Sequence, residues 1–139
     1  MKNLLVLLLV LFTFLLPQGA VADDISDLKE SVEAVREKLV VLLVATDKEK
    51  QAAQVKNIKQ LSQEIDTKLD VLLKSEKTSE KVKKKLVEFQ EIWAAFRTTR
   101  DTQIIPNILS GDEEKIKEAK IVARTTQAER FQRMQALLQ

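Results

Sequence analysis

The chain has 139 residues, enough for one domain, and its formal net charge is only +2. It contains no cysteine and no histidine, which excludes disulfides, thiolate nucleophiles, imidazole bases and the usual zinc sites. The small net charge argues against nucleic-acid binding, which needs a marked basic excess on one face. We therefore expect a non-catalytic protein without cofactor or metal, stabilised by an apolar core.

The first 22 residues have the pattern of a secretory signal peptide. Lys2 supplies the positive end, residues 4–16 are an uncharged apolar run, and Ala20-Val21-Ala22 fits the small-x-small cleavage pattern. The run is about 13 residues long, short of the roughly 20 that span a bilayer. We expect residues 23–139 to form a periplasmic or secreted domain. The alternative is an uncleaved segment, residues 4–22, that anchors the domain in the inner membrane.

Past the signal peptide, Pro106 and Gly111 are the only helix breakers in the sequence, and no alternating strand pattern occurs. The domain is therefore predicted to be all-α. A first helix is expected over about 25–45, with an apolar seam in steps of three and four residues. Thr46-Asp47-Lys48-Glu49 reads as a capping box that starts a second helix, about 47–74.

The second half of the chain predicts two more helices. One is expected over about 79–109 and the other over about 112–138, joined by the turn Ser110-Gly111-Asp112-Glu113. Short connections make consecutive helices antiparallel neighbours, so the four should form an up-down-up-down bundle. The aromatic side chains expected to dominate one end of its core are Phe89, Trp93, Phe96 and Phe131.

The tripeptide Arg-Thr-Thr occurs twice, at residues 97–99 and 124–126. In an antiparallel hairpin with its turn near residues 110–111, Arg97 and Arg124 lie level, about 20 Å from the turn at 1.5 Å per residue. Stepping along the third helix from Trp93 and Phe96 reaches a polar stripe of Arg100, Gln103 and Asn107, beside a kink expected at Pro106. Asp101 is placed to pair with Arg97, and Arg100 to reach Glu118 or a ligand.

Two interpretations of the repeated tripeptide remain open. In the functional one, guanidinium groups and hydroxyls bind a carboxylate or phosphate. The candidate ligand-binding residues are then Arg97, Thr98, Thr99, Arg100, Arg124, Thr125 and Thr126. In the other, these side chains coat a solvated hairpin face and the threonines bond back to their own helices.

Three further stretches have alternative interpretations. Residues 39–45 are apolar all round, which fits either a dimer interface through the first helix or a deeply buried helix end. The lysine-rich stretch 74–85 fits either anionic lipid headgroups or a solvated helix start. Residues 112–114 are acidic, and we interpret them as complementing a helix dipole rather than as a metal site.

The order LLVATDKEK, then VEFQEIWAAFRTTRD, then ILSGDEEKIKEA resembles the four-helix-bundle ligand-binding domain of bacterial methyl-accepting chemotaxis receptors. This resemblance implies a periplasmic sensor domain, often a homodimer, that binds small molecules between its helices. Such receptors normally continue into a second membrane span, a HAMP linker and a cytoplasmic signalling coiled coil. None of these is present up to Gln139, so a free-standing sensor module is expected.

The functional expectation is a non-enzymatic bundle that binds a small anionic molecule or a partner's helix. A homodimer through the first helix is one expected assembly, and membrane contact is expected only if the N-terminal segment is uncleaved. The alternative is a structural or chaperone-like periplasmic protein that acts through protein–protein contacts.

Overall fold

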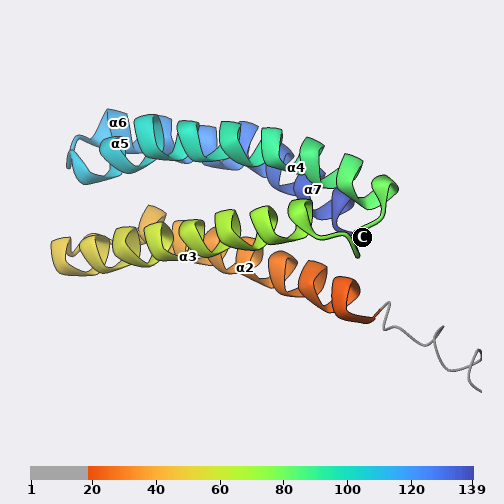
Figure 1. Cartoon of the computed structure of the whole chain (residues 1–139). Coiled ribbons are helices and arrows are strands. Elements are labelled where there is room, and N and C mark those ends of the chain that lie inside the picture. Colours follow the sequence, from red (N-terminus) through yellow and green to blue (C-terminus); the bar gives the residue numbers. More distant parts are fainter. Residues whose placement is uncertain (1–18) are drawn as a thin grey trace, which may run out of the picture.

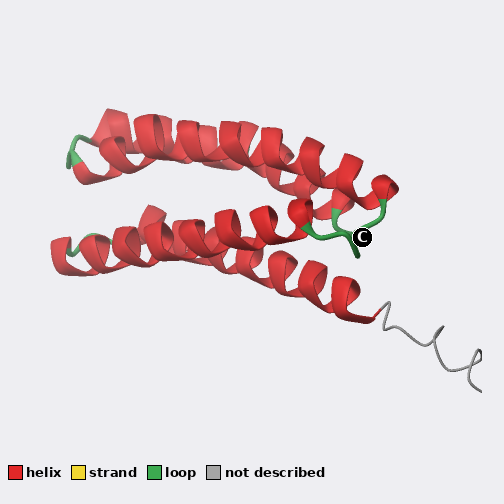
Figure 2. Cartoon of the chain, viewed as in Figure 1, coloured by secondary structure: helices red, strands yellow, loops and turns green. Residues whose placement is uncertain are grey.

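The computed structural model describes residues 19–139. The predicted signal peptide, residues 1–22, lies outside this part except for its last four positions, which form the first turn of a helix. Every element of the described chain is helical (Figure 2). None of these helices is both long and apolar enough to span a membrane. The all-α prediction is confirmed.

The helices follow one another in four antiparallel rods (Figure 1). The third rod passes through a π-helical turn, η1, and the fourth is divided in two. Their bounds are α2 (Gly19–Val44), α3 (Lys48–Lys74), α4 (Glu80–Thr99), η1 (Arg100–Ile104), α5 (Ile105–Leu109), α6 (Glu113–Arg124) and α7 (Thr126–Leu137). The first rod therefore begins earlier than its predicted start near residue 25, and the up-down-up-down topology is the predicted one.

Polar side chains cap the starts of three rods. Asp47 caps α3, and its carboxylate accepts a 2.9 Å hydrogen bond from the backbone N–H of Lys50. Ser79 and Asp112 cap α4 and α6 in the same way. The predicted cap at Thr46 is thus wrong by one residue. Asp47 satisfies the free backbone N–H and also places a negative charge at the positive end of the helix dipole.

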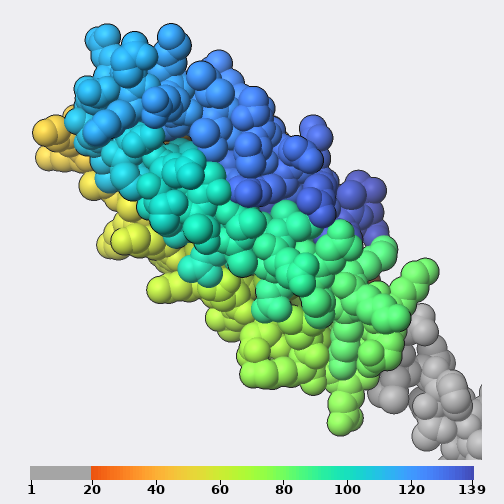
Figure 3. All heavy atoms as spheres, turned by 90° about the horizontal axis from the view of Figure 1, so that it is seen from above, coloured from red at the N-terminus to blue at the C-terminus, as the bar shows by residue number. Residues whose placement is uncertain are grey.

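The bundle consists of two helical hairpins packed face to face (Figure 1). Within them, α2 packs mainly on α3 and α4 mainly on α7, and Figure 3 shows the α4 and α7 rods side by side from above. The inner faces of α2 and α3 repeat an apolar side chain every seven residues. The side chains in these two seams are at most 1% exposed: Leu28, Val35, Leu42, Ile58, Ile65 and Leu72. Their burial holds the first hairpin together, at about 25 cal/mol per Å² of apolar surface.

The second hairpin contributes the aromatic side chains of the core. Trp93 and Phe96 stack with their ring centroids 5.7 Å apart. The exposed fractions of the four aromatic side chains are 0% for Phe89, 2% for Trp93, 3% for Phe96 and 7% for Phe131. The four aromatic side chains predicted for the core are therefore buried.

The π-helical turn η1 lies directly before Pro106. At its end the N–H of Ile105 bonds to the carbonyl of Arg100, five residues back, so the turn holds one residue more than a regular helix. The extra residue rotates the remainder of the third rod about its axis. Gln103 is exposed and Asn107 half-buried, so the predicted polar stripe is wrong beyond Arg100. Three isoleucines take the core positions instead: Ile104, Ile105 and Ile108.

The predicted single helix over 112–138 is interrupted at Thr125. The backbone there has φ −108° and ψ −90°, outside the helical range. The hydroxyl of Thr125 donates a 2.8 Å hydrogen bond to the carbonyl of Ile121, one turn earlier. Such back-bonding by threonine bends helices. The fourth rod is therefore divided into α6 and α7 at one of the two Arg-Thr-Thr segments.

Candidate functional site

The first Arg-Thr-Thr segment, in α4, faces α3 through its arginine. Arg97 forms an ion pair with Asp66 of α3, and the same carboxylate accepts a 2.9 Å hydrogen bond from the indole of Trp93. The hydroxyl of Thr98 bonds back to the carbonyl of Ala94 at 3.0 Å. The charge of Arg97 is thus neutralised by a partner within the bundle.

Arg100 is a buried cation with protein partners on two sides. Its side chain is 1% exposed. Its guanidinium donates to both carboxylate oxygens of Asp101, at 2.7 and 3.2 Å, and to the hydroxyl of Ser62 at 2.9 Å. The predicted pairing of Asp101 with Arg97 is therefore wrong, because Arg97 points to Asp66 on the neighbouring helix. A buried charge needs such partners, and Arg100 has them without a ligand.

The remaining members of the two tripeptides are dispersed. Thr99 accepts a 2.7 Å hydrogen bond from Arg130 of α7, whereas Thr125 bonds back to its own helix. Arg124 and Thr126 are exposed. Gln127 and Arg130 both bond to backbone carbonyls of α4 near Phe96, within about one turn of the predicted register. The two segments are thus at similar heights, but Arg97 and Arg100 turn toward α3 while Arg124 lines a groove beside α2.

This groove runs between α2 on one side and α6 and α7 on the other. It consists of two adjoining cavities with volumes of about 730 Å³ and 330 Å³. Both are lined by Arg36 and Val40 of α2 and by Ala128 and Phe131 of α7. We call it the α2–α7 groove. It lies where α2, which packs mainly on α3, makes little close contact with α6 and α7.

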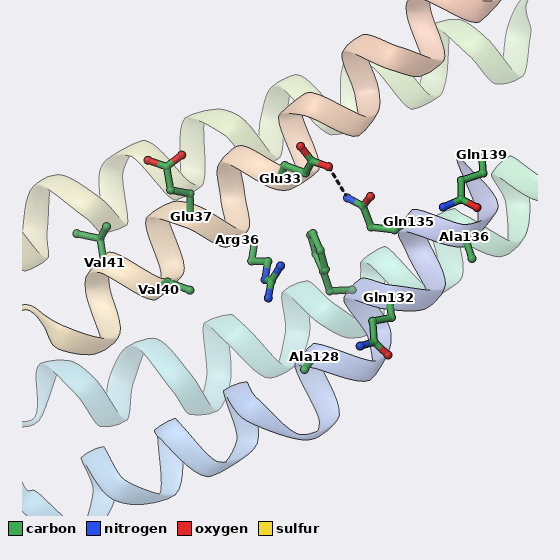
Figure 4. A pocket seen from close by; sticks show the side chains of 11 residues that line it. Glu33, Arg36, Glu37, Val40, Val41, Ala128, Gln132, Gln135, Ala136 and Gln139 are labelled. Carbon is green, nitrogen blue, oxygen red and sulfur yellow. Dashed lines mark hydrogen bonds between the residues drawn. The ribbon is translucent and has the colours of Figure 1, made fainter.

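The larger cavity is of mixed charge. Glu33, Arg36 and Glu37 line its α2 wall (Figure 4). Gln135 of α7 reaches across and donates a 3.2 Å hydrogen bond to Glu33. The guanidinium carbon of Arg36 lies 4.5 Å from the ring centroid of Phe131, a cation–π contact. These two contacts join α2 to α7 by side chains.

The smaller cavity is cationic. Arg36, Lys120 and Arg124 contribute to its lining, and none of the described residues that line it is acidic. Its other walls are apolar and come from α2, α4, α6 and α7: Leu39, Val40, Leu43, Val44, Phe96, Ala123, Ala128 and Phe131. Gln127, which also lines it, is 2% exposed and its amide donates a 2.8 Å hydrogen bond to the carbonyl of Phe96. The arrangement suits an anion.

A family model described as the four helix bundle sensory module for signal transduction matches residues 20–139. The chain belongs to this family. The resemblance to the sensory module of chemotaxis receptors is thereby confirmed, and sensing rather than catalysis is the family's general role. No curated protein and no solved structure matches the chain.

In this sensory module, Arg36 and Lys120 are groove residues that sequence reasoning missed. Two signals pointed toward the groove, although neither singles out Arg36. Lys120 and Arg124 are four residues apart, so they share one face of α6. The apolar stretch 39–45 covers more than one face of its helix, and its excess valines, Val40 and Val44, line the smaller cavity.

Proposed function

We propose that this sensory module works outside the cytoplasmic membrane and binds a small anionic molecule in the α2–α7 groove without transforming it. One observation supports a negatively charged ligand. The smaller cavity combines Arg36, Lys120 and Arg124 with apolar walls, and no acidic residue of the described chain lines it. An anion placed there gains charge-assisted hydrogen bonds in a partly desolvated space.

The location is supported by the sequence and by the family. Residues 1–22 have the charge, apolar run and cleavage pattern of a signal peptide, and a sensory module for signal transduction receives its stimulus from outside the cell. A periplasmic domain sampling small solutes agrees with both observations.

Arg124 is the member of the repeated tripeptides best suited to this role. Arg97 and Arg100 already have carboxylate partners in Asp66 and Asp101. A ligand would have to displace these partners and leave a carboxylate unpaired. Arg124 is exposed and lines the groove, so it can bind an anion at no such cost.

Thermal unfolding of the purified protein against a panel of small anions tests the proposal. A ligand at 100 times its dissociation constant should add about 2.7 kcal/mol to the free energy of unfolding, several degrees at this size. Arg124→Gln should abolish the shift. Arg133→Gln is the matched control, because Arg133 is an exposed arginine of α7 that lies outside the lining of both cavities and only 3.6 Å from Glu88.

Absence of a shift with every anion, or an equal shift in Arg124→Gln, would refute anion binding in the groove. That result would favour the alternative of a structural or chaperone-like protein that acts through protein–protein contacts.

A second function, self-association through α2, is favoured by three exposed valines. Val40, Val41 and Val44 are 51%, 38% and 70% exposed. All three lie near the C-terminal end of α2. A second copy would cover this apolar surface. Sedimentation equilibrium should then show a dimer that Val44→Glu dissociates, whereas Val87→Glu, at a 47% exposed valine of α4, leaves it intact. A monomer at all concentrations would exclude this function.

A further inference from the structure

We infer that the ligand of the α2–α7 groove is a monocarboxylic acid with an apolar body of several carbon atoms, not an amino acid or a short dicarboxylate. This inference rests on the proposed function and names the class of molecule that the same site takes. The inference is drawn from the smaller cavity, because its lining combines a cationic part with an apolar part and so suits a molecule with one charged end.

The charged end of the ligand belongs beside α6. Lys120 and Arg124 are one turn apart on that helix and both line the cavity. A guanidinium can donate two parallel hydrogen bonds to one carboxylate. Their side chains are half-buried and exposed, respectively, so a carboxylate can reach them from solvent without losing all of its hydration.

The apolar body of the ligand belongs deeper in the groove. Leu39 and Leu43 of α2 line the cavity together with Phe96 and Phe131. Phe96 and Phe131 are 3% and 7% exposed, so they form a firm floor. A hydrocarbon chain or ring placed against these side chains leaves water, which is the main source of affinity for an apolar group. The cavity volume of about 330 Å³ lies within the range of roughly 300–1,000 Å³ for small-molecule sites.

A second charge next to either end of the ligand is disfavoured, a carboxylate at the far end of the groove and an ammonium beside the cationic end. A second carboxylate would meet the apolar walls or Arg36, whose guanidinium is stacked over Phe131 and has Glu33 and Glu37 beside it on α2 (Figure 4). The ammonium group of an amino acid would sit among Arg36, Lys120 and Arg124 with no carboxylate of the described chain in the lining to receive it. Burying a charge without a partner is costly.

Isothermal titration of the purified protein with straight-chain acids from butyrate to octanoate tests the inference. The affinity should rise about fourfold for each added methylene, which corresponds to about 0.8 kcal/mol per CH₂. Succinate and 1-octanol complete the series, since one has a second charge and the other has the apolar body without a charge. Both should bind at least tenfold more weakly than octanoate.

Two pairs of variants locate the binding. Ala128→Leu fills the groove from α7 and should weaken octanoate at least tenfold, whereas Ala94→Leu, at an exposed alanine of α4, should not. Arg124→Gln should weaken every acid of the series by a similar factor while Arg133→Gln leaves the affinities unchanged.

Each contrary outcome has a distinct meaning. Equal binding of succinate and octanoate, or no dependence on chain length, overturns the inferred class and leaves anion binding in place. Equal binding of 1-octanol and octanoate overturns the carboxylate. If no acid binds but another small anion raises the melting temperature, only the inference fails. If no anion of any kind acts, the proposed function fails as well.

Discussion

The indole N–H of Trp93 donates a 2.9 Å hydrogen bond to one carboxylate oxygen of Asp66, and Arg97 occupies the other oxygen. A single carboxylate on α3 therefore satisfies two side chains of α4 that are one turn apart. Trp93 is 2% exposed, so its N–H has exchanged water for this bond. The contact aligns α3 with α4 and removes Arg97 from the surface charge available to ligands.

Replacing Asp66 with alanine should lower the free energy of unfolding by about 1–3 kcal/mol, the cost of a buried donor without a partner. Urea denaturation followed by tryptophan fluorescence measures this, because Trp93 is the only tryptophan of the chain. Asp70→Ala is the control. Asp70 pairs with Lys74 on the exposed side of the same helix, and its loss should cost no more than about 0.5 kcal/mol. Equal effects of the two changes would contradict a special role of Asp66.

Arg100 and Asp101 should respond asymmetrically to substitution. Asp101→Ala leaves the buried guanidinium without its anion and should destabilise the protein by about 1.5–3 kcal/mol. Arg100→Met replaces the buried cation by an apolar side chain of similar length and leaves Asp101, which is 46% exposed, to water. The Met variant should therefore be as stable as the parent or more stable.

Chemical denaturation of both variants gives the two free energies. Glu88→Ala, which breaks the exposed 3.6 Å pair with Arg133, sets the scale of a surface contact at about 0–1 kcal/mol. A strongly destabilised Arg100→Met would contradict this. It would show that the ion pair itself stabilises this part of the bundle, and that Asp101 does more than neutralise the buried charge of Arg100.

Deletion of Thr102 combined with Pro106→Ala should preserve the fold. The deletion removes the extra residue of η1, and the substitution removes the ring that clashes with the preceding turn. A regular helix then still directs Ile104, Ile105 and Ile108 into the core. The expected result is cooperative thermal unfolding with a melting temperature near that of the parent.

Deletion of Glu91, an exposed residue in the middle of α4, is the contrasting case. It rotates one half of the helix by about 100° against the other, since a regular helix has 3.6 residues per turn. This variant should lose cooperative unfolding. If both deletions behave alike, the rotation attributed to η1 does not set the core positions.

Gly111→Ala should destabilise the turn between the third and fourth rods. Gly111 has φ +71°, and a Cβ added there would have no atom within 4 Å, so the cost is purely one of backbone conformation. It should amount to about 1–2 kcal/mol in thermal or urea unfolding. Gly111→Asn should cost less, because asparagine tolerates the left-handed region better. A neutral Gly111→Ala would indicate that the turn readjusts.

Much of the architecture could be predicted from local features of the chain. The seven-residue spacing of Leu28, Val35 and Leu42 predicts a helix with one buried face, and Ser79 and Asp112 mark where rods begin. Periodicity and capping are properties of short segments, so they can be recognised in the sequence before the fold is known. The buried aromatic side chains follow from the same periodicity, as does the match of the helical pattern to a family of sensory modules.

The site, by contrast, depended on tertiary structure. The partner of Arg97 is 31 residues away in the sequence, and the groove joins Arg36 and Val40 to Lys120 and Arg124. One extra residue in η1 turned Gln103 outward and brought isoleucines into the core. Sequence by itself determined which segments form helices and which faces are apolar. Only the packed bundle decided which arginines are neutralised and which face a groove, because that depends on the rotation and spacing of whole helices against one another.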